Sequence, residues 1–149
     1  MTNSRAPSLP CICASLRRTS RVITQLYEDA LRPAGLRGTQ FTVLQTLSLA
    51  GEVTQGELGE ILAMDSTTLT RTLTIMSRHG WIAKRRGADR REWRMRLSRA
   101  GQTQFKRALP HWQKAQTQLR RQLGDELADK LMKLTQNVTN ALIDKGESL

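Results

Sequence analysis

The chain has few of the residues on which catalysis, metal binding or disulfide cross-linking depend. Among its 149 residues are only two cysteines and two histidines. Cys11 and Cys13 are separated by a single residue and cannot form the disulfide framework typical of small secreted domains. A structural zinc site needs four ligands, and one Cys-x-Cys pair with His79 and His111 far along the chain does not match that spacing. We therefore expect no metal and no cofactor.

Long apolar runs are also missing. No window approaches the roughly 20 apolar residues of a membrane span. The order of a secretory signal is reversed, since a proline-containing stretch precedes Arg17 and Arg18. A glycine-rich phosphate loop, a carboxylate cluster and a Cys-His-Asp order are absent too. We expect a soluble, cytoplasmic protein that is not an enzyme and does not contact a membrane.

Acidic residues are scarce relative to basic ones. Lys and Arg number 24 against 13 Asp and Glu, which gives a formal net charge of +11. Residues 84–99 hold eight basic and two acidic side chains and so carry +6 of that charge. A basic balance of this size favours an acidic partner, either nucleic acid or an anionic surface.

The length fits one domain, residues 1–149, and its pattern is mainly helical. Helices are predicted near residues 15–31, 39–50, 54–62 and 66–79, followed by a long one from residue 98 and a last one after Gly124. Thr54 and Glu57 have the spacing of a capping box at the start of the third helix. Between residues 80 and 98 the apolar residues alternate instead, which predicts two strands joined by a turn at 87–89. The fold class is therefore mainly α with a small two- to three-stranded β wing.

Two short helices, a tight turn and then a hairpin are the order of a winged helix-turn-helix, here residues 36–100, whose second helix enters the major groove of DNA. In the helix at 66–79, Leu69, Leu73 and Met76 form an apolar stripe, and many other positions are Ser or Thr. These are mediocre helix formers, but their hydroxyl and methyl groups suit phosphates and base edges. The candidate DNA contacts in this part are Thr54, Ser66, Thr67, Thr68, Thr70, Arg71, Thr74 and Arg78.

The basic hairpin supplies a second set of candidate DNA contacts. Its cations can neutralise backbone phosphates, and an arginine at the tip can enter a narrow minor groove. The set is Lys84, Arg85, Arg86, Asp89, Arg90 and Arg91. A solvated charged face is the simpler alternative for such a run. A non-specific architectural nucleic-acid-binding protein is the alternative function.

Three segments make the sequence resemble the multiple antibiotic resistance regulator (MarR) family over nearly its whole length. They are residues 35–44 (GLRGTQFTVL), 54–62 (TQGELGEIL) and 80–101 (GWIAKRRGADRREWRMRLSRAG). In the last, Asp89 and Arg91 stand at the Asp-x-Arg positions of the family's wing. The resemblance implies a sequence-specific regulator, in most cases a repressor, that binds a palindromic double-stranded DNA operator. It also implies a homodimer built by helices in residues 11–33 and 101–146, and a small aromatic or other small-molecule effector that releases the DNA.

The cysteines raise the alternative of a thiol-based oxidant sensor. In the hydroperoxide-sensing branch of the family, the reactive cysteine lies fourteen residues before a tyrosine, and Cys13 stands in that relation to Tyr27. Arg17 and Gly38 occupy positions where that branch carries further tyrosines. A small side chain at a helix end is the simpler explanation of Cys11 and Cys13.

Overall fold

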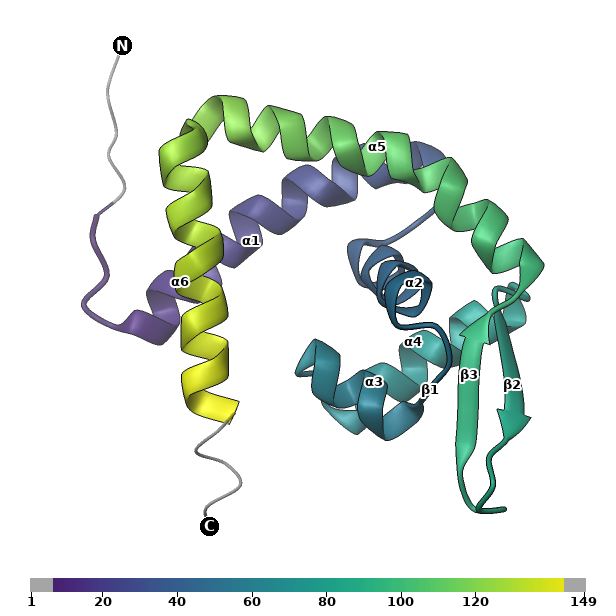
Figure 1. The fold of residues 1–149 in the computed structure, drawn as a ribbon. Coiled ribbons are helices and arrows are strands. Elements are labelled where there is room, and N and C mark those ends of the chain that lie inside the picture. Colours follow the sequence, from purple (N-terminus) through teal and green to yellow (C-terminus); the bar gives the residue numbers. More distant parts are fainter. Residues whose placement is uncertain (1–6, 144–149) are drawn as a thin grey trace. The chain divides into compact units, whose positions relative to one another are not determined.

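The computed structural model describes residues 7–143, and within them lie six α-helices, a 3₁₀ turn and a small three-stranded sheet (Figure 1). Residues 7–112 and 113–143 form two compact units, with the boundary inside the long helix α5. Residues 144–146, the end of the predicted dimerisation segment, lie outside the described residues. The elements are α1 (Ile12–Leu31), a 3₁₀ turn (Arg32–Ala34), α2 (Gly38–Ala50), β1 (Val53–Thr54), α3 (Gln55–Leu62), α4 (Ser66–Arg78), β2 (Ile82–Arg86), β3 (Trp93–Leu97), α5 (Arg99–Leu123) and α6 (Asp125–Ile143).

Side chains cap both helices of the helix-turn-helix. The hydroxyl of Thr54 accepts a hydrogen bond from the backbone N–H of Glu57 at 3.1 Å, and the Glu57 carboxylate accepts from the N–H of Thr54 at 2.7 Å. The predicted capping box is therefore confirmed. At the start of α4, Asp65 accepts from the backbone N–H of Thr68 at 2.9 Å. Between the helices, Ala63 has a left-handed backbone with φ of 48°, which ends α3 abruptly and keeps the turn short.

The sheet has three strands in the order β1-β3-β2, all antiparallel. Strands β2 and β3 form the predicted hairpin, with Ile82 opposite Leu97 and Arg86 opposite Trp93. The additional strand, β1, pairs Val53 with Met95 and runs directly into α3. The sheet thus joins the hairpin to the helix-turn-helix.

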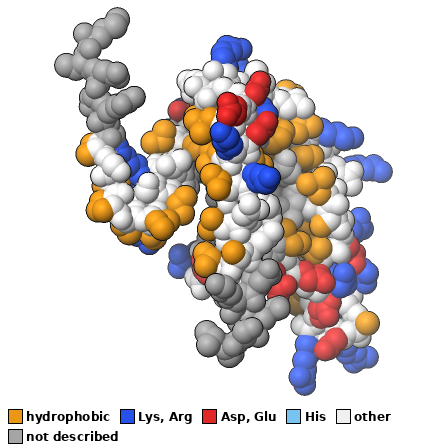
Figure 2. Space-filling view, turned by 60° about the vertical axis from the view of Figure 1, so that its left-hand side comes forward, with side chains coloured by type: hydrophobic (Ala, Val, Ile, Leu, Met, Phe, Trp, Pro, Cys, Tyr) orange, Lys and Arg blue, Asp and Glu red, His pale blue; other side chains and the backbone are white. Residues whose placement is uncertain are grey.

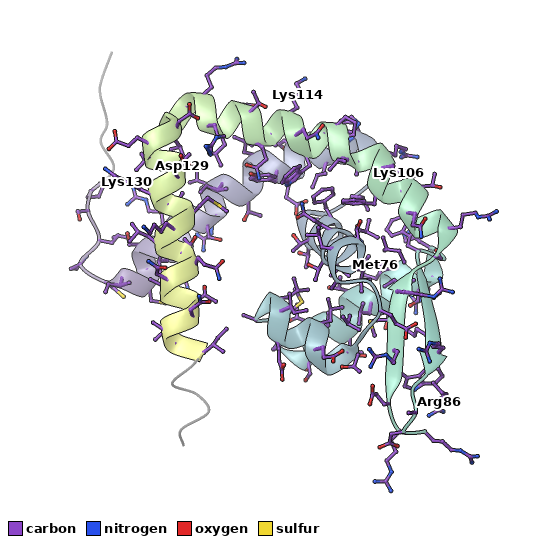
Figure 3. The ribbon with its side chains drawn as sticks, viewed as in Figure 1. Met76, Arg86, Lys106, Lys114, Asp129 and Lys130 are labelled. Carbon is purple, nitrogen blue, oxygen red and sulfur yellow. The ribbon has the colours of Figure 1, made fainter. Side chains whose placement is uncertain are left out.

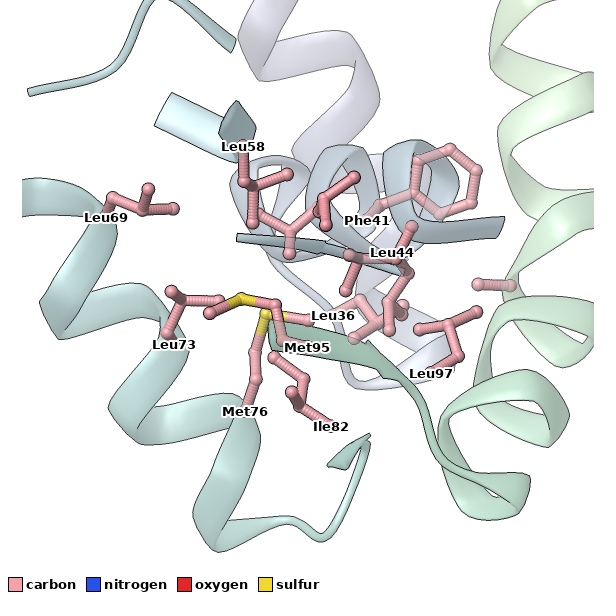
Figure 4. Packing of buried hydrophobic residues seen from close by; sticks show 14 of the residues in the cluster. Leu36, Phe41, Leu44, Leu58, Leu69, Leu73, Met76, Ile82, Met95 and Leu97 are labelled. Atoms are coloured by element: carbon pink, nitrogen blue, oxygen red, sulfur yellow. The ribbon is translucent and has the colours of Figure 1, made fainter. Parts of the chain in front are cut away.

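A single apolar cluster lies between α2, α3, α4 and the sheet (Figure 4). The predicted stripe of α4 is confirmed, because Leu69, Leu73 and Met76 are all almost fully buried. Met95 contributes from β3 and Leu44 from α2. Full burial of a side chain of this size contributes roughly 1.5–3 kcal/mol, so this cluster fixes α4 against the sheet.

The start of α5 is fitted closely against the segment that follows α4. A Cβ atom on Gly101 would lie 2.0 Å from the carbonyl oxygen of Trp81, so only glycine fits at this position. Beside it, the Ser98 hydroxyl donates to the carbonyl of Gly80 at 2.5 Å and accepts from the N–H of Gly101 at 3.0 Å. The two ends of the β2–β3 hairpin, at residues 80–81 and 98–101, are therefore held together.

The second unit consists of the end of α5, the turn at Gly124 and α6. Arg120 bridges this turn, with nitrogens 3.2 Å from a carboxylate oxygen of Asp125 and 2.6 Å from one of Asp129. Helix α6 leaves several large apolar side chains exposed on the single chain. They are Leu127, Met132, Leu134, Val138, Leu142 and Ile143. Even so, none of the helices described is both long and apolar enough to cross a membrane.

Candidate nucleic-acid interface

The surface of α4 opposite the core carries the predicted reading face. The predicted residues Ser66, Thr67, Thr68, Thr70, Arg71, Thr74 and Arg78 are exposed. Leu69 and Leu73 point into the protein from the same helix. The chain thus presents a polar helix face to solvent, as insertion into a duplex groove requires.

Several hydroxyl groups on this face donate back to the protein. The hydroxyl of Thr72 donates to the carbonyl of Thr68 at 3.0 Å, and that of Thr74 donates to the carbonyl of Thr70 at 2.8 Å. The hydroxyl of Thr68 donates to Asp65 at 2.6 Å. With their protons engaged, these side chains offer methyl groups and oxygen lone pairs outward, and the Arg71 and Arg78 guanidinium groups are donors with no partner within residues 7–143.

Helix α3 contributes a side chain to the same face that the sequence pattern did not single out. The Nε2 of Gln55 donates to the hydroxyl oxygen of Thr70 at 2.9 Å, although the two residues are 15 positions apart in the sequence. A pair between two helices leaves no local pattern in the sequence, and only the position of Gln55 at the start of α3 hinted at it. Thr54, which was predicted as a contact, uses its hydroxyl oxygen to cap α3.

The tip of the hairpin is shaped by Asp89. Its carboxylate accepts from the backbone N–H of Arg91 at 2.9 Å, and its carbonyl accepts from the N–H of Glu92 at 3.0 Å. These bonds make a tight turn from which Arg90 and Arg91 extend into solvent. Neither guanidinium has an ion pair or a side-chain hydrogen bond within residues 7–143, so both are available to phosphates.

Other arginines of the hairpin are engaged. Glu52, which precedes β1, pairs with Arg85 of β2 and with Arg94 of β3, and the Nε of Arg85 donates to it at 2.9 Å. The hydrogen bond from Arg85 is the main reason that the pKa of Glu52 lies below its ordinary value. Arg94 also pairs with Glu92 at 3.0 Å, which raises its pKa. Glu52 therefore clamps both strands of the hairpin to the end of α2.

Arg86 is held in another way. Figure 3 labels Arg86 in the hairpin. Its guanidinium carbon lies 4.2 Å from the centre of the Trp93 ring, a cation–π contact, and one of its terminal nitrogens donates to the carbonyl oxygen of Arg90. Basic and acidic side chains are accordingly intermixed on the face drawn in Figure 2. Among the predicted hairpin contacts, Lys84, Arg90 and Arg91 are unengaged within the described residues, whereas Arg85 and Arg86 have partners in the protein.

A hollow of about 500 Å³ lies between the end of α2, the end of β3 and the first half of α5. Leu47, Phe105 and Leu109 form its apolar wall. Lys106, Arg96 and Glu52 also line it; Glu52 is paired with Arg85 and Arg94, whereas Lys106 and Arg96 have no ion pair within residues 7–143. An apolar wall with two cations that lack an ion pair suits a small acid with an apolar body.

The two cysteines lie at the start of α1. Cys11 is the N-cap, where its sulfur accepts from the backbone N–H of Ala14 at 3.5 Å, and Cys13 follows in the first turn. Both thiols are free and exposed. No group of three or more histidine, cysteine, aspartate or glutamate side chains that could hold a metal occurs in the described part of the chain.

Comparisons with known proteins agree with this architecture. The model of the MarR family matches residues 36–93, from the start of α2 to β3. An uncharacterised HTH-type transcriptional regulator of Bacillus subtilis, YwoH, is 30% identical over 90 residues, which are 60% of this chain and 66% of that relative's length. The structure resembles the Mycobacterium tuberculosis transcriptional regulator MosR in complex with DNA, with 34% identity, a TM-score of 0.80 and coverage of 90% of this chain and 97% of that one.

A further likeness, at lower identity, supports the fold. A mutant of Escherichia coli MarR complexed with operator DNA has 22% identity and a TM-score of 0.77, with coverage of 85% of this chain and 92% of that chain. The matched segment includes both helices of the helix-turn-helix and most of the hairpin, which can now be called the wing. The chain therefore belongs to the MarR family of DNA-binding transcriptional regulators.

Proposed function

We propose that the protein acts in the cytoplasm as a homodimeric repressor that binds a palindromic operator, with α4 in the major groove and the wing on the adjacent backbone. One observation carries this proposal: α4 exposes a face of hydroxyls and Arg71, while the wing of the same unit exposes Arg90 and Arg91, whose guanidinium groups have no partner in the described part of the chain. The first group suits base edges and the second suits phosphates. MosR and E. coli MarR, which share the fold, were crystallised with DNA.

A dimer accounts for apolar side chains that the single chain leaves in water. On α1, Ile12 and Val22 are 81% and 69% exposed, and on α6 Met132 is 68% exposed. Surfaces of this kind are costly on a monomer and typical of an interface. We assign dimerisation to segments 11–33 and 101–146, and the two α4 helices of such a dimer would read half-sites about one helical turn apart.

The experiment is footprinting followed by binding measurements at matched salt. A protected dyad should appear near the genes that the protein controls, and its affinity should exceed that for scrambled DNA by a thousandfold or more. Arg71→Ala should lower operator affinity much more than affinity for random DNA, by roughly 1–3 kcal/mol. A ratio near one for the wild-type protein would instead indicate a non-specific architectural protein.

The effector of this regulator is proposed to be a small acid with an apolar body that binds in the hollow beside α5. The apolar wall and the unpaired Lys106 support this assignment. Salicylate is a suitable probe: titration should lower operator affinity, and Lys106→Ala should weaken that response. Equal binding of salicylate to the free and the DNA-bound protein would argue against this role, because an effector must bind the two states unequally.

Thiol sensing is a second candidate, favoured by two exposed thiols one residue apart at a helix start. A hydroperoxide would oxidise one thiol to a sulfenic acid and be reduced to an alcohol, and the second thiol would then displace water to form a disulfide. Peroxide should release operator DNA, and a dithiol reductant should restore binding. Cys13→Ser and Cys11→Ser should each abolish the response, and a response that survives in both variants would remove this candidate.

A further inference from the structure

The hydrogen bond between Gln55 and Thr70 places a second helix in contact with the reading face of α4. Thr70 is exposed in the middle of that face, and the amide nitrogen of Gln55 lies 2.9 Å from its hydroxyl oxygen. Gln55 is the first residue of α3, and the capping box immediately before it fixes where the helix begins. The amide is therefore held over α4 from a well-defined backbone position.

The hydrogen-bonding capacity of this amide is only partly used. A glutamine side chain has two N–H donors and one carbonyl oxygen. Thr70 takes one donor, which fixes which way the amide faces, and within residues 7–143 the second N–H and the oxygen have no partner. An N–H beside a C=O is the arrangement that pairs with N7 and N6 of adenine in the major groove.

We propose that Gln55 reads an adenine in each half-site through its free N–H and its carbonyl oxygen, and that Thr70 acts as the residue that positions it. This inference rests on the proposed function, since it requires α4 to lie in the major groove. It adds a base contact from α3 to those of α4. A phosphate oxygen accepts hydrogen bonds but donates none, so it would leave the Gln55 carbonyl oxygen unpaired, whereas adenine satisfies both groups.

The test is selection of duplexes from a random pool with the full-length protein, for the wild type and for variants. The wild type should select a dyad with a preference for adenine at one position of each half-site, worth about 5- to 150-fold over other bases. Gln55→Ala should remove that preference and leave the other positions unchanged. Gln55→Glu should move it toward cytosine, because a carboxylate accepts from the cytosine N4 amino group but cannot donate to adenine N7.

Thr70→Val tests the positioning role, because it keeps the shape of the side chain and removes the oxygen that Gln55 contacts. It should weaken the adenine preference, and the double variant Gln55→Ala/Thr70→Val should lose no more of it than Gln55→Ala alone. Thr42→Val is the matched control: it makes the same change at an exposed threonine of α2, outside the reading face, and it should leave this position unchanged. Melting curves should show all variants folded.

Three results would overturn the inference. If Gln55→Ala lowers affinity equally for all duplexes, the side chain binds phosphate. If it changes neither affinity nor preference, the contact with Thr70 only joins the two helices. If the wild type selects no common sequence at all, the proposed function fails and this inference fails with it. The first two results contradict only the inference about Gln55 and leave the proposed function intact.

Discussion

Arg94 is joined to Glu52 by two contacts, one to the side chain and one to the backbone. Its Nε lies 3.2 Å from a carboxylate oxygen of Glu52, and one of its terminal nitrogens donates to the Glu52 carbonyl at 3.2 Å. Arg85 pairs with the same carboxylate from the neighbouring strand. The charges of two wing arginines are thereby used inside the protein, and one acidic side chain joins both strands of the wing to the segment after α2.

Glu52→Gln should loosen the wing while the helix-turn-helix stays folded. The carboxamide keeps the size of the side chain but loses the charge that holds two guanidinium groups. We expect faster amide hydrogen exchange in β2 and β3, a small fall in melting temperature and weaker operator binding. Glu60→Gln, on the exposed side of α3, serves as the control; equal exchange rates in the two variants would show that the clamp has no role.

The salt dependence of DNA binding should separate the cations that bind phosphates from those that hold the wing. Removing one phosphate contact lowers the slope of log K against log salt by about 0.9. In a homodimer each substitution removes two such contacts, so Arg90→Ala and Arg91→Ala should each lower the slope by about 1.8, because neither guanidinium has a partner within the described residues. Arg85→Ala should leave the slope nearly unchanged, since Glu52 already neutralises this side chain. A reduction of the same size for Arg85→Ala would overturn this division.

Gly101→Ala should destabilise the first unit. The new Cβ would meet the carbonyl oxygen of Trp81 at 2.0 Å. Because the position of a Cβ is set by its own backbone and the oxygen is part of the backbone, α5 or the segment after α4 must move. Overpacking of this kind costs roughly 1–3 kcal/mol, measurable by urea denaturation. Gly56→Ala is the contrasting variant, because its Cβ would meet nothing closer than 3.8 Å. It should be neutral or slightly stabilising, and a large loss there would show that the cost is not specific to position 101.

Stability should fall as the solution is acidified below the ordinary pKa range of carboxylic acids. Hydrogen bonds from Thr54 lower the pKa of Glu57 below 4.5, and those from Thr68 lower the pKa of Asp65 below 3.8. A carboxyl whose folded pKa is lowered stabilises the native state above its unfolded pKa, and loses this effect as pH falls through the folded value. Urea midpoints should therefore drop between about pH 5 and pH 2.

Variants at the caps identify the source of that drop. Asp65→Asn keeps an acceptor for the N–H of Thr68 but cannot titrate, so its midpoints should depend less on pH. Asp125→Asn, in the exposed first turn of α6, changes one charge without removing a cap of the helix-turn-helix. A pH profile for Asp65→Asn that matches the wild type would contradict the assignment to this cap.

Local patterns in the sequence were sufficient for most of the helix-turn-helix. The capping box at Thr54, the stripe of Leu69, Leu73 and Met76, and the alternation in β3 follow from residues a few positions apart. Helix α1 extends further than its apolar pattern, beginning at Ile12 with Cys11 as its cap. Strand β1 has two residues and is too short to show an alternating pattern.

The relations that organise the candidate interface were not visible in this way. Glu52 and Arg85 are 33 residues apart, and Gln55 and Thr70 are 15 apart, so each pair is created only when the chain folds. Composition therefore predicted a basic wing, but it could not divide the cations into free and engaged ones. The roles of the predicted contacts in DNA binding stay predictions until the variants are measured.

Thr54 belongs to two elements at once, since it is the last residue of β1 and the N-cap of α3. Through it the backbone passes without a linker from the sheet that carries the wing into the helix-turn-helix. Neither part can swivel without breaking the shared hydrogen bonds. In a dimer, the helix-turn-helix and wing of each subunit would then bind DNA as one rigid part. A signal would have to act by changing the distance between the two rigid parts.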